Sequence, residues 1–450
     1  MTNTKRLALA FAASAIAITS AQAGGFSRGN ANLDGLYASE YRDQPVIGSA
    51  GVTFVSPGRS YSEVNGVVAT GAVTGFNPTT GAPNIDAATV SFSQGSTDFA
   101  EDFGVYFASV GVRFHDRVNC VGSFSEPYGA NSEYEGPIEY FLQSQSIDTY
   151  ELGATCSVGF DLGRGRAYAI GGVFYESLEY SQARDFRALD DDVTLPILQP
   201  GAQALGATDV SRINVTGEAL GYRIGAAYEI PEIALRASLI YRSETDYDDI
   251  SGSFSNTPFA GIFAGRAAAA ARAGNSALAV QQRGFAVAAG TSQSSTATAE
   301  ATLPQQLELS LRSGVAPGTL VFGSIRWTDW SVIERIDLND QFSGEAFTEF
   351  EGFFDDGWTV TLGVGRAFNE DLAGSLAITW DEGVGTGFDT FTDTYTLAGG
   401  LAYDLNEVAN IRGGGALVYF TEGEKTQGDF TAESPGEFGF ALSAGLNVKF

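Results

Sequence analysis

The sequence predicts an all-β protein, a transmembrane antiparallel β-barrel of about 14 strands with a short N-terminal hatch in its lumen. The last thirteen residues, Phe438 to Phe450, are apolar at every second position and small or polar between, and the chain ends on an aromatic residue. Successive side chains of a strand point to opposite faces, so this segment has one apolar and one polar face. A soluble sandwich strand shares such alternation, but a terminal phenylalanine is typical of bacterial outer-membrane barrels.

The N-terminus predicts export from the cytoplasm. Lys5 and Arg6 precede an apolar stretch over residues 7–18, and Ala21-Gln22-Ala23 follows it. This is the charged region, hydrophobic region and small-x-small cleavage site of a signal peptide. An apolar stretch of about twelve residues is too short to span a bilayer. Residues 1–23 are therefore expected to be a signal peptide, and the mature chain starts near Gly24.

Composition supports a large membrane barrel and excludes a nucleic-acid partner. The chain has 25 basic and 54 acidic residues; the leader removes Lys5 and Arg6, which leaves 23 basic residues and a formal charge near −31. Nucleic-acid binding needs a basic surface, whereas acidic charge keeps exposed loops soluble. The roughly 427 mature residues are many for one soluble domain but ordinary for a barrel of a dozen or more strands.

Segments of about ten alternating residues recur through the chain and are expected to form the barrel, residues 49–450. Within 150–160, for example, Leu152 and Val158 share one face while Glu151 and Ser157 share the other. Strands are expected to begin near residues 50, 103, 117, 146, 165, 217, 233, 305, 319, 357, 371, 393, 408 and 437.

The predicted connections alternate between short and long. The long ones cover about 126–146, 182–216, 250–304, 331–356, 382–392 and 422–436, and each pair is separated by a short turn. An even-stranded barrel with periplasmic turns and long extracellular loops requires this order, with both termini on the periplasmic side. The expected location is the bacterial outer membrane, crossed many times.

Two regions lack the period of a strand. Residues 24–48 are expected to form a plug or arm inside the barrel. The alanine-rich stretch 258–290 contains three arginines, which disfavour a transmembrane helix. Amphipathic helices in an extracellular loop fit this stretch, and low-complexity surface filler is the alternative.

Short motifs occur in a fixed order along the mature chain: Gly25-Phe26 with Ala31-Asn32-Leu33-Asp34-Gly35-Leu36, Glu126-Pro127-Tyr128-Gly129, Gly221-Tyr222-Arg223-Ile224-Gly225-Ala226, Leu303-Pro304, Trp327-Thr328-Asp329-Trp330-Ser331 and Trp380-Asp381-Glu382. Together with the strand count, this order resembles the FadL family of outer-membrane transporters for long-chain fatty acids and other hydrophobic compounds. The chain departs from the family after Tyr41, where the Asn-Pro-Ala element that ends the family's hatch is missing.

The resemblance implies passive transport of hydrophobic molecules, most of all long-chain fatty acids. It implies a capture site in the loops, a deeper lumen site, and lateral exit through an opening at the third strand, near Val118 to Phe124. A monomer, inserted into outer-membrane lipid by the barrel assembly machinery and working without a cofactor, is expected.

Strand alternation predicts which charges face the lumen. Because Leu220, Tyr222 and Ile224 share the outward face, Arg223 points inward. The same rule turns four more arginines inward: Arg236, Arg242, Arg312 and Arg326. Two interpretations remain open. Arg223, Arg242 and Arg326 hold a ligand carboxylate through bidentate hydrogen bonds, or the arginines pair with acids such as Glu308, Asp34, Glu40 and Asp43.

Apolar ligand contacts are expected from two places. The hatch offers Phe26, Leu33 and Leu36, and the long loop offers Phe259, Ile262 and Phe263. Burial of an alkyl chain gains roughly 0.8 kcal/mol per methylene, so an apolar pocket alone can hold an acyl tail. The four tryptophans are expected in interfacial girdles, with ligand stacking as the alternative: Trp327, Trp330, Trp358 and Trp380.

The two cysteines lie in the predicted third and fourth strands. Cys120 and Cys156 both fall a few residues from a periplasmic turn, and an oxidising compartment allows a disulfide between them. Two separate thiols facing lipid would give the same pattern, so both alternatives stay open.

The residues needed for catalysis or metal binding are not evident. His115 is the single histidine and falls in a predicted turn, and no Cys/His cluster or phosphate-binding glycine loop occurs. An enzyme, a metal site and a cofactor are therefore not expected. The rival functions are a water-filled porin for small polar solutes and a surface receptor or adhesin anchored by a barrel.

Overall fold

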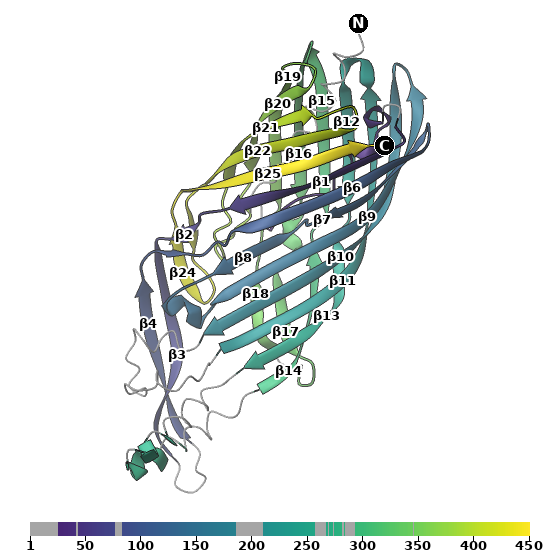
Figure 1. The fold of residues 1–450 in the computed structure, drawn as a ribbon. Coiled ribbons are helices and arrows are strands. Elements are labelled where there is room, and N and C mark those ends of the chain that lie inside the picture. The colour runs from purple at the N-terminus through teal and green to yellow at the C-terminus, as the bar shows by residue number, and fades with distance from the viewer. Residues whose placement is uncertain are drawn as a thin grey trace.

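A closed antiparallel barrel dominates the computed structural model (Figure 1). The structure describes residues 26–41, 44–76, 83–185, 210–256, 267–268, 270–272, 274–280, 283, 293–344 and 346–450; the predicted signal peptide lies outside them. Fourteen strands form the wall: β1 (Val46–Ser56), β6 (Phe103–His115), β7 (Val118–Ser125), β9 (Ser144–Leu162), β10 (Gly165–Asp185), β11 (Val210–Ile230), β12 (Leu235–Arg242), β15 (Gln306–Ala316), β16 (Thr319–Thr328), β19 (Gly357–Ala367), β20 (Leu372–Asp381), β21 (Thr394–Asp404), β22 (Ala409–Phe420) and β25 (Glu437–Lys449).

The barrel closes where the first strand meets the last. Ala50 of β1 lies opposite Ala108 of β6 on one side and opposite Leu446 of β25 on the other. The remaining wall strands pair with their neighbours in sequence order. The predicted fold and strand number are confirmed.

The wall continues beyond the membrane as further strands where the sequence predicted loops. These strands are β8 (Gly129–Glu133), β13 (Thr245–Asn256), β14 (Gln293–Leu303), β17 (Arg335–Asp340) and β18 (Ala346–Glu351). They pair with one another and with β9 and β11, so one side of the barrel is much taller than the other (Figure 1). Parts of the predicted loops 126–146, 250–304 and 331–356 are therefore regular sheet.

An extracellular arm follows β1, and sequence patterns did not reveal it. It contains β2 (Ser60–Tyr61), β3 (Glu63–Phe76), β4 (Pro83–Gln94) and β5 (Thr97–Asp98). β3 and β4 form a sheet with β23 (Gly423–Lys425) and β24 (Phe430–Ser434), and their hairpin projects from the barrel end opposite the C-terminus (Figure 1). A cluster of aromatic and aliphatic side chains, including Tyr61, Phe92, Tyr134, Phe141 and Phe430, supports this sheet.

The two faces of the wall have opposite character, as the alternation predicts. Outward side chains such as Leu220, at 78 % exposure, and Leu362, at 65 %, form an apolar outer surface. Inward side chains such as Glu151 and Ser157 are fully buried. A lipid-facing apolar band around a polar interior is the arrangement of an outer-membrane barrel. Within the described residues, no helix has the length and apolar character needed to cross a bilayer.

Residues 26–41 lie inside the barrel. They include the short 3-10 helices η2 (Asp34–Leu36) and η3 (Ala38–Glu40); three others, η4 (Pro137–Tyr140), η6 (Pro231–Ile233) and η7 (Trp330–Val332), lie in connections. Leu36 and Tyr37 pack against the inward side chains Val121, Tyr168 and Ile170. The segment 34–41 therefore occupies the periplasmic half of the lumen.

Candidate ligand site and transport path

An aromatic cluster around Phe26 fills the extracellular half of the lumen. The ring of Phe26 meets Trp330, Phe350, Phe354 and Phe391 with centroid distances of 5.9, 5.9, 5.5 and 5.2 Å. These five rings, with Tyr128, are called the aromatic cluster below; Tyr128 lies 5.5 Å from Trp330. Trp330 is only 1 % exposed. The expectation that it belongs to an interfacial girdle is wrong, because η7 turns it into the lumen.

Backbone pairing fixes Phe26 within the aromatic cluster. Gly129 N donates to Phe26 O at 2.7 Å, Arg28 N donates to Pro127 O at 2.8 Å, and Ser27 bridges Tyr128. Arg28 also forms an ion pair with Asp148 at 2.7 Å. Residues 26–28 thus lie as a short extended segment against the inner side of the connection between β7 and β8.

On the periplasmic side of the aromatic cluster, two buried arginines form ion pairs with two buried glutamates. Glu151 of β9 accepts hydrogen bonds from Arg223 and from Arg242 Nε, the latter at 3.2 Å. Glu176 of β10 pairs with Arg242 and accepts from Thr245 Oγ1 at 2.8 Å. Buried charges in proteins are normally paired in this way. Arg223 and Arg242 are therefore ion-paired, as the second interpretation expects, with acids that the sequence analysis did not pair with them; ligand binding by these arginines stays a prediction.

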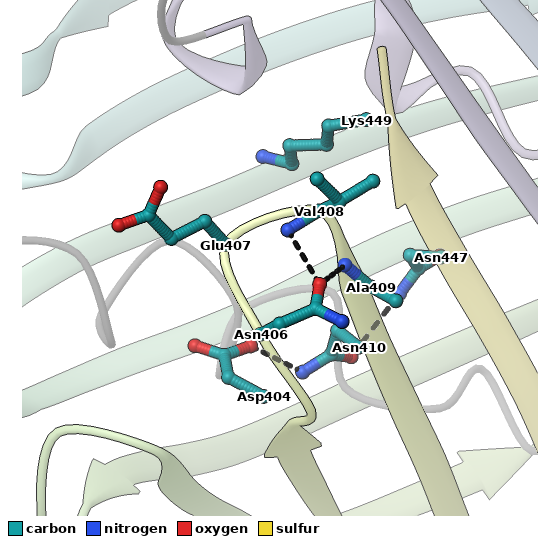
Figure 2. Close-up of a pocket in the computed structure, with 8 residues that line it drawn as sticks. All are labelled: Asp404, Asn406, Glu407, Val408, Ala409, Asn410, Asn447 and Lys449. Carbon is teal, nitrogen blue, oxygen red and sulfur yellow. Dashed lines mark hydrogen bonds between the residues drawn. The ribbon is translucent and has the colours of Figure 1, made fainter.

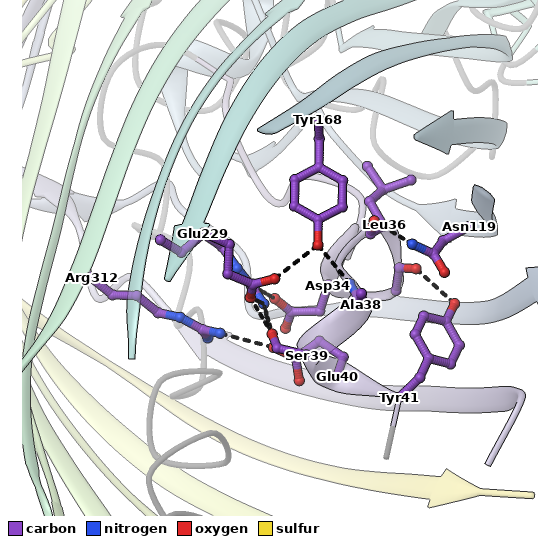
Figure 3. Close-up of polar contacts among 12 residues, drawn as sticks. Asp34, Leu36, Ala38, Ser39, Glu40, Tyr41, Asn119, Tyr168, Glu229 and Arg312 are labelled. Atoms are coloured by element: carbon purple, nitrogen blue, oxygen red, sulfur yellow. Dashed lines mark hydrogen bonds and ion pairs between the residues drawn. The ribbon is translucent and has the colours of Figure 1, made fainter. Parts of the chain in front are cut away.

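A second ionic cluster ties the hatch to the periplasmic half of the wall. Arg236 contacts Asp34 at 3.2 Å, Glu40 at 2.7 Å and Glu229 at 3.1 Å. Figure 3 shows Arg312 reaching Glu40 from the next strand, at 3.0 Å. Asp34 and Glu40 thus act as the hatch acids that the second alternative named, while Asp43 lies outside the described residues.

Backbone groups of the hatch are also held by wall side chains. Asn119 Nδ2 donates to Leu36 O at 3.1 Å, and Ala38 N donates to Tyr168 OH at 3.1 Å (Figure 3). At the C-terminal strand, Lys449 Nζ donates to Glu40 O at 2.9 Å. Polar contacts from several strands therefore fix residues 34–41 in place.

Arg326 differs from the other inward arginines. Among the described residues no carboxylate lies within ion-pair distance of it, its Nη2 donates to Thr359 Oγ1 at 3.3 Å, and its buried Nε has no hydrogen-bond partner. Glu308 is its register neighbour on β15, but that carboxylate accepts instead from Ser310 Oγ at 3.4 Å. Gln306, two residues before Glu308 on β15, donates to Tyr128 OH at 3.1 Å, so Arg326 lies next to the inward position that contacts the aromatic cluster. Arg326 thus offers a cation with free donors beside buried rings.

The other residues expected to contact ligand fall in separate places. Phe26 is in the aromatic cluster, whereas Leu33 and Leu36 pack in the periplasmic half with Tyr37. Phe259, Ile262 and Phe263 of the long loop lie outside the described residues. In the same loop, residues 270–272 and 276–280 are helical.

Cys120 and Cys156 face each other across β7 and β9 and are joined by a disulfide. Their neighbours Asn119 and Ser157 are buried in the lumen, so strand alternation puts the disulfide on the outer face.

The third wall strand is interrupted between β7 and β8. On β6, pairing with β7 starts at Ala108, opposite Phe124, while residues 103–107 pair only with β1 on the other side. The interrupted stretch Glu126 to Tyr128 bends inward, and the Tyr128 side chain is fully buried. This wall break lies beside the aromatic cluster.

A small pocket at the periplasmic end has a different character (Figure 2). Its lining is mostly polar, and Asn406 Oδ1 accepts from Val408 N at 2.8 Å and Ala409 N at 2.9 Å, which closes the turn between β21 and β22. Asn410 Nδ2 donates to Asp404 Oδ1 at 2.7 Å. These groups satisfy one another, so the pocket is not a site for an apolar ligand.

The apolar outer surface, the filled lumen and the aromatic cluster define an outer-membrane transport channel. Residues 149–422 match the family described as Outer membrane protein transport protein (OMPP1/FadL/TodX). The chain belongs to this family, whose members are transport channels of the bacterial outer membrane rather than enzymes. No group of three or more metal-ligating side chains occurs within the described part of the chain.

Named relatives and solved structures agree with this membership. The long-chain fatty acid transport protein of Salmonella typhi is 21 % identical over 337 residues, which cover 72 % of this chain and 71 % of that protein. A FadL homologue of Pseudomonas aeruginosa has a TM-score of 0.63 at 16 % identity, covering 95 % of this chain and all of the other. The toluene transporter TodX of Pseudomonas putida has a TM-score of 0.54 at 12 % identity, covering 95 % and 96 %. These structures share the fold.

Proposed function

We propose that the protein carries long-chain fatty acids across the outer membrane by passive diffusion, with Arg326 as the head-group ligand. The observation that supports this is an unpaired lumen cation beside a cluster of buried aromatic rings. Such a site suits a molecule with an acyl tail and a carboxylate, because the rings bury the tail and guanidinium donors bind the carboxylate. The relative from Salmonella is named for long-chain fatty acid transport, and TodX for toluene, so both names describe hydrophobic cargo.

Phe26 occupies the place that the ligand tail takes. Its ring is held by edge-on contacts with Trp330, Phe354 and Phe391 and a tilted contact with Phe350, and aromatic pairs of this kind contribute about 0.5–1.5 kcal/mol each. A long acyl chain buries more apolar surface than one phenyl ring, so it competes for the same position. Ligand first lands on the extracellular loop that contains Phe259, Ile262 and Phe263, and then reaches the aromatic cluster.

The exit is the wall break. Two observations support lateral release: the periplasmic half of the lumen is filled by the firmly held residues 34–41, and residues 103–107 of β6 lack strand partners toward β7 and β8. A hydrophobic ligand that passes between β6 and the third strand enters lipid directly. It avoids the cost of crossing the polar periplasmic mouth.

Substitution of Arg326 tests the head-group assignment. Arg326→Ala is expected to weaken binding of a fluorescent fatty acid to the purified protein by about 10- to 100-fold, since hydrogen bonds to charged groups contribute about 1.5–3 kcal/mol. Arg326→Lys keeps the charge and is expected to retain part of the affinity. Binding of toluene, which has no carboxylate, is expected to be unchanged.

Arg366→Ala is the matched control, because Arg366 is exposed at a periplasmic turn. Fatty-acid binding to Arg326→Ala as tight as to the wild type, with normal uptake in a transport-deficient strain, would contradict the proposed site.

A further inference from the structure

Glu126 lies in the wall break. Its carboxylate Oε2 accepts a hydrogen bond from the backbone N–H of Tyr106 at 2.8 Å, across the gap between the third strand and β6. Glu126 follows the last residue of β7, and its side chain is partly exposed in the gap itself. Tyr106 is outward, at 54 % exposure. A carboxylate thus sits in the membrane-facing opening.

The register shows why Tyr106 needs this acceptor. Ala108 pairs with Phe124 below the break and Ala100 bridges Ser132 above it, eight residues farther along each strand. The register is therefore the same on both sides of the break, and the register partner of Tyr106 is Glu126. Because the third strand bows inward there, the side chain of Glu126 takes the place of a strand-to-strand backbone hydrogen bond.

Energetics indicate that this contact has a function. A backbone N–H left without an acceptor in the membrane costs several kcal/mol. An ionisable side chain near lipid is itself costly and marks functional positions. A continuous strand would satisfy the N–H with a backbone carbonyl and without a charge. The inward bend with Glu126 is therefore less stable than a continuous strand, but it allows the two strands to separate.

We propose that Glu126 is the latch of the wall break: its hydrogen bond to Tyr106 N–H holds β6 and the third strand together between transport events. This inference rests on the proposed lateral exit. Opening requires the Glu126–Tyr106 bond to break, which exposes one N–H and one carboxylate to the passing ligand. Glu126 positions the strands and does not bind the cargo in the lumen.

On the lumen side of the same gap lies Arg28, which has partners other than Glu126. The guanidinium of Arg28 lies 4.5 Å from the ring centroid of Phe103 and also contacts Asp148 of β9. Loss of the latch is therefore expected to loosen the wall without removing residues 26–28 from the lumen. Ligand affinity and opening rate should respond separately to substitution.

Three variants of the full-length protein in lipid vesicles test the latch. Glu126→Ala removes the acceptor, Glu126→Gln keeps a carbonyl acceptor without charge, and Glu179→Ala removes an exposed glutamate from β10 as the control. The measurements are hydrogen exchange of the peptide that contains Tyr106, the dissociation constant of a fluorescent fatty acid, and its rate of uptake.

Glu126→Ala is expected to speed exchange at Tyr106 about 10- to 100-fold, which corresponds to the loss of one hydrogen bond to a charged group. It is also expected to raise the uptake rate while the dissociation constant stays the same. Glu126→Gln keeps a neutral acceptor and should give a smaller increase in exchange than Glu126→Ala, whereas Glu179→Ala should behave like the wild type. Unchanged exchange in Glu126→Ala would overturn the latch, and so would faster exchange without a change in uptake. If neither Glu126→Ala nor Arg326→Ala changes binding or uptake, the proposed function fails together with the latch. If Arg326→Ala is defective while Glu126→Ala behaves like the wild type, only the latch is overturned.

Discussion

At the scale of single residues, the interior is organised by pairs of opposite charge. Alternation alone turned five arginines inward; Arg223, Arg236 and Arg242 are buried, and the other two are partly exposed in the lumen. The same rule places Glu151 in the lumen, yet its partners could not be foreseen. Which residue meets Glu151 depends on the relative height of β9, β11 and β12, and that stagger is set by barrel geometry rather than by any one strand.

Glu151 supports two arginines, so its removal should be costly. Glu151→Ala leaves Arg223 without a carboxylate and Arg242 with Glu176 only, and loss of one partner of a buried pair costs about 3–5 kcal/mol. Urea unfolding in vesicles, followed by tryptophan fluorescence, would measure the change. Asp337→Ala breaks an exposed pair with Arg335 and is expected to leave the midpoint unchanged. Equal midpoints for both variants would show that the buried network does not stabilise the barrel.

At the scale of elements, the sequence was informative where a strand crosses lipid and less so elsewhere. Transmembrane strands must alternate over about ten residues, so all fourteen could be located. The arm of β3 and β4 was missed because outside the membrane neither face has to be apolar along its whole length. The aromatic cluster was missed for a related reason: Trp330 lies in a short 3-10 turn, where a period of two does not apply.

The disulfide acts on the pair of strands that borders the wall break. Cys120 and Cys156 are separated by 36 residues, and in the chain-entropy account a cross-link of that length stabilises the folded state by about 3–4 kcal/mol. Replacement of both cysteines by alanine is expected to lower the free energy of unfolding by that amount. Electrophoresis with and without reductant, after free thiols are blocked, checks the bond itself. Free thiols in the native protein would contradict it.

At the scale of the whole molecule, the lumen is filled on one side and lined with small residues on the other. Residues 26–41 and the charged pairs bury the inner faces of β7, β9, β10, β11 and β12. The opposite wall carries Ser324, Thr361, Ala377, Gly400 and Gly414 inward, all partly exposed. Residues 26–41 therefore fill a part of the lumen that a water-filled porin would leave open.

Deletion of residues 34–41 should convert the channel into an open pore. The wild-type protein is expected to show little ionic conductance in planar bilayers, because these residues occupy the periplasmic half of the lumen. The deletion is expected to raise conductance severalfold while circular dichroism remains strand-rich. Glu40→Gln, which keeps the segment but loses two ion pairs, is the control and should conduct less than the deletion. A large conductance in the wild type would favour the porin.

The pairing of β24 with β3 has a consequence for closure of the barrel. Thr431 lies opposite Asn65 in the arm, while Gly445 lies opposite Gly51 in the wall. N-terminal and C-terminal strands therefore pair at two places, one outside the membrane and one within it. Both pairings require residues 421–450. Without them the wall is open at both β22 and β1, and β3 loses its pairing with β24. A chain truncated at residue 420 should therefore lose closure of the wall and the support of β3 in the arm at once.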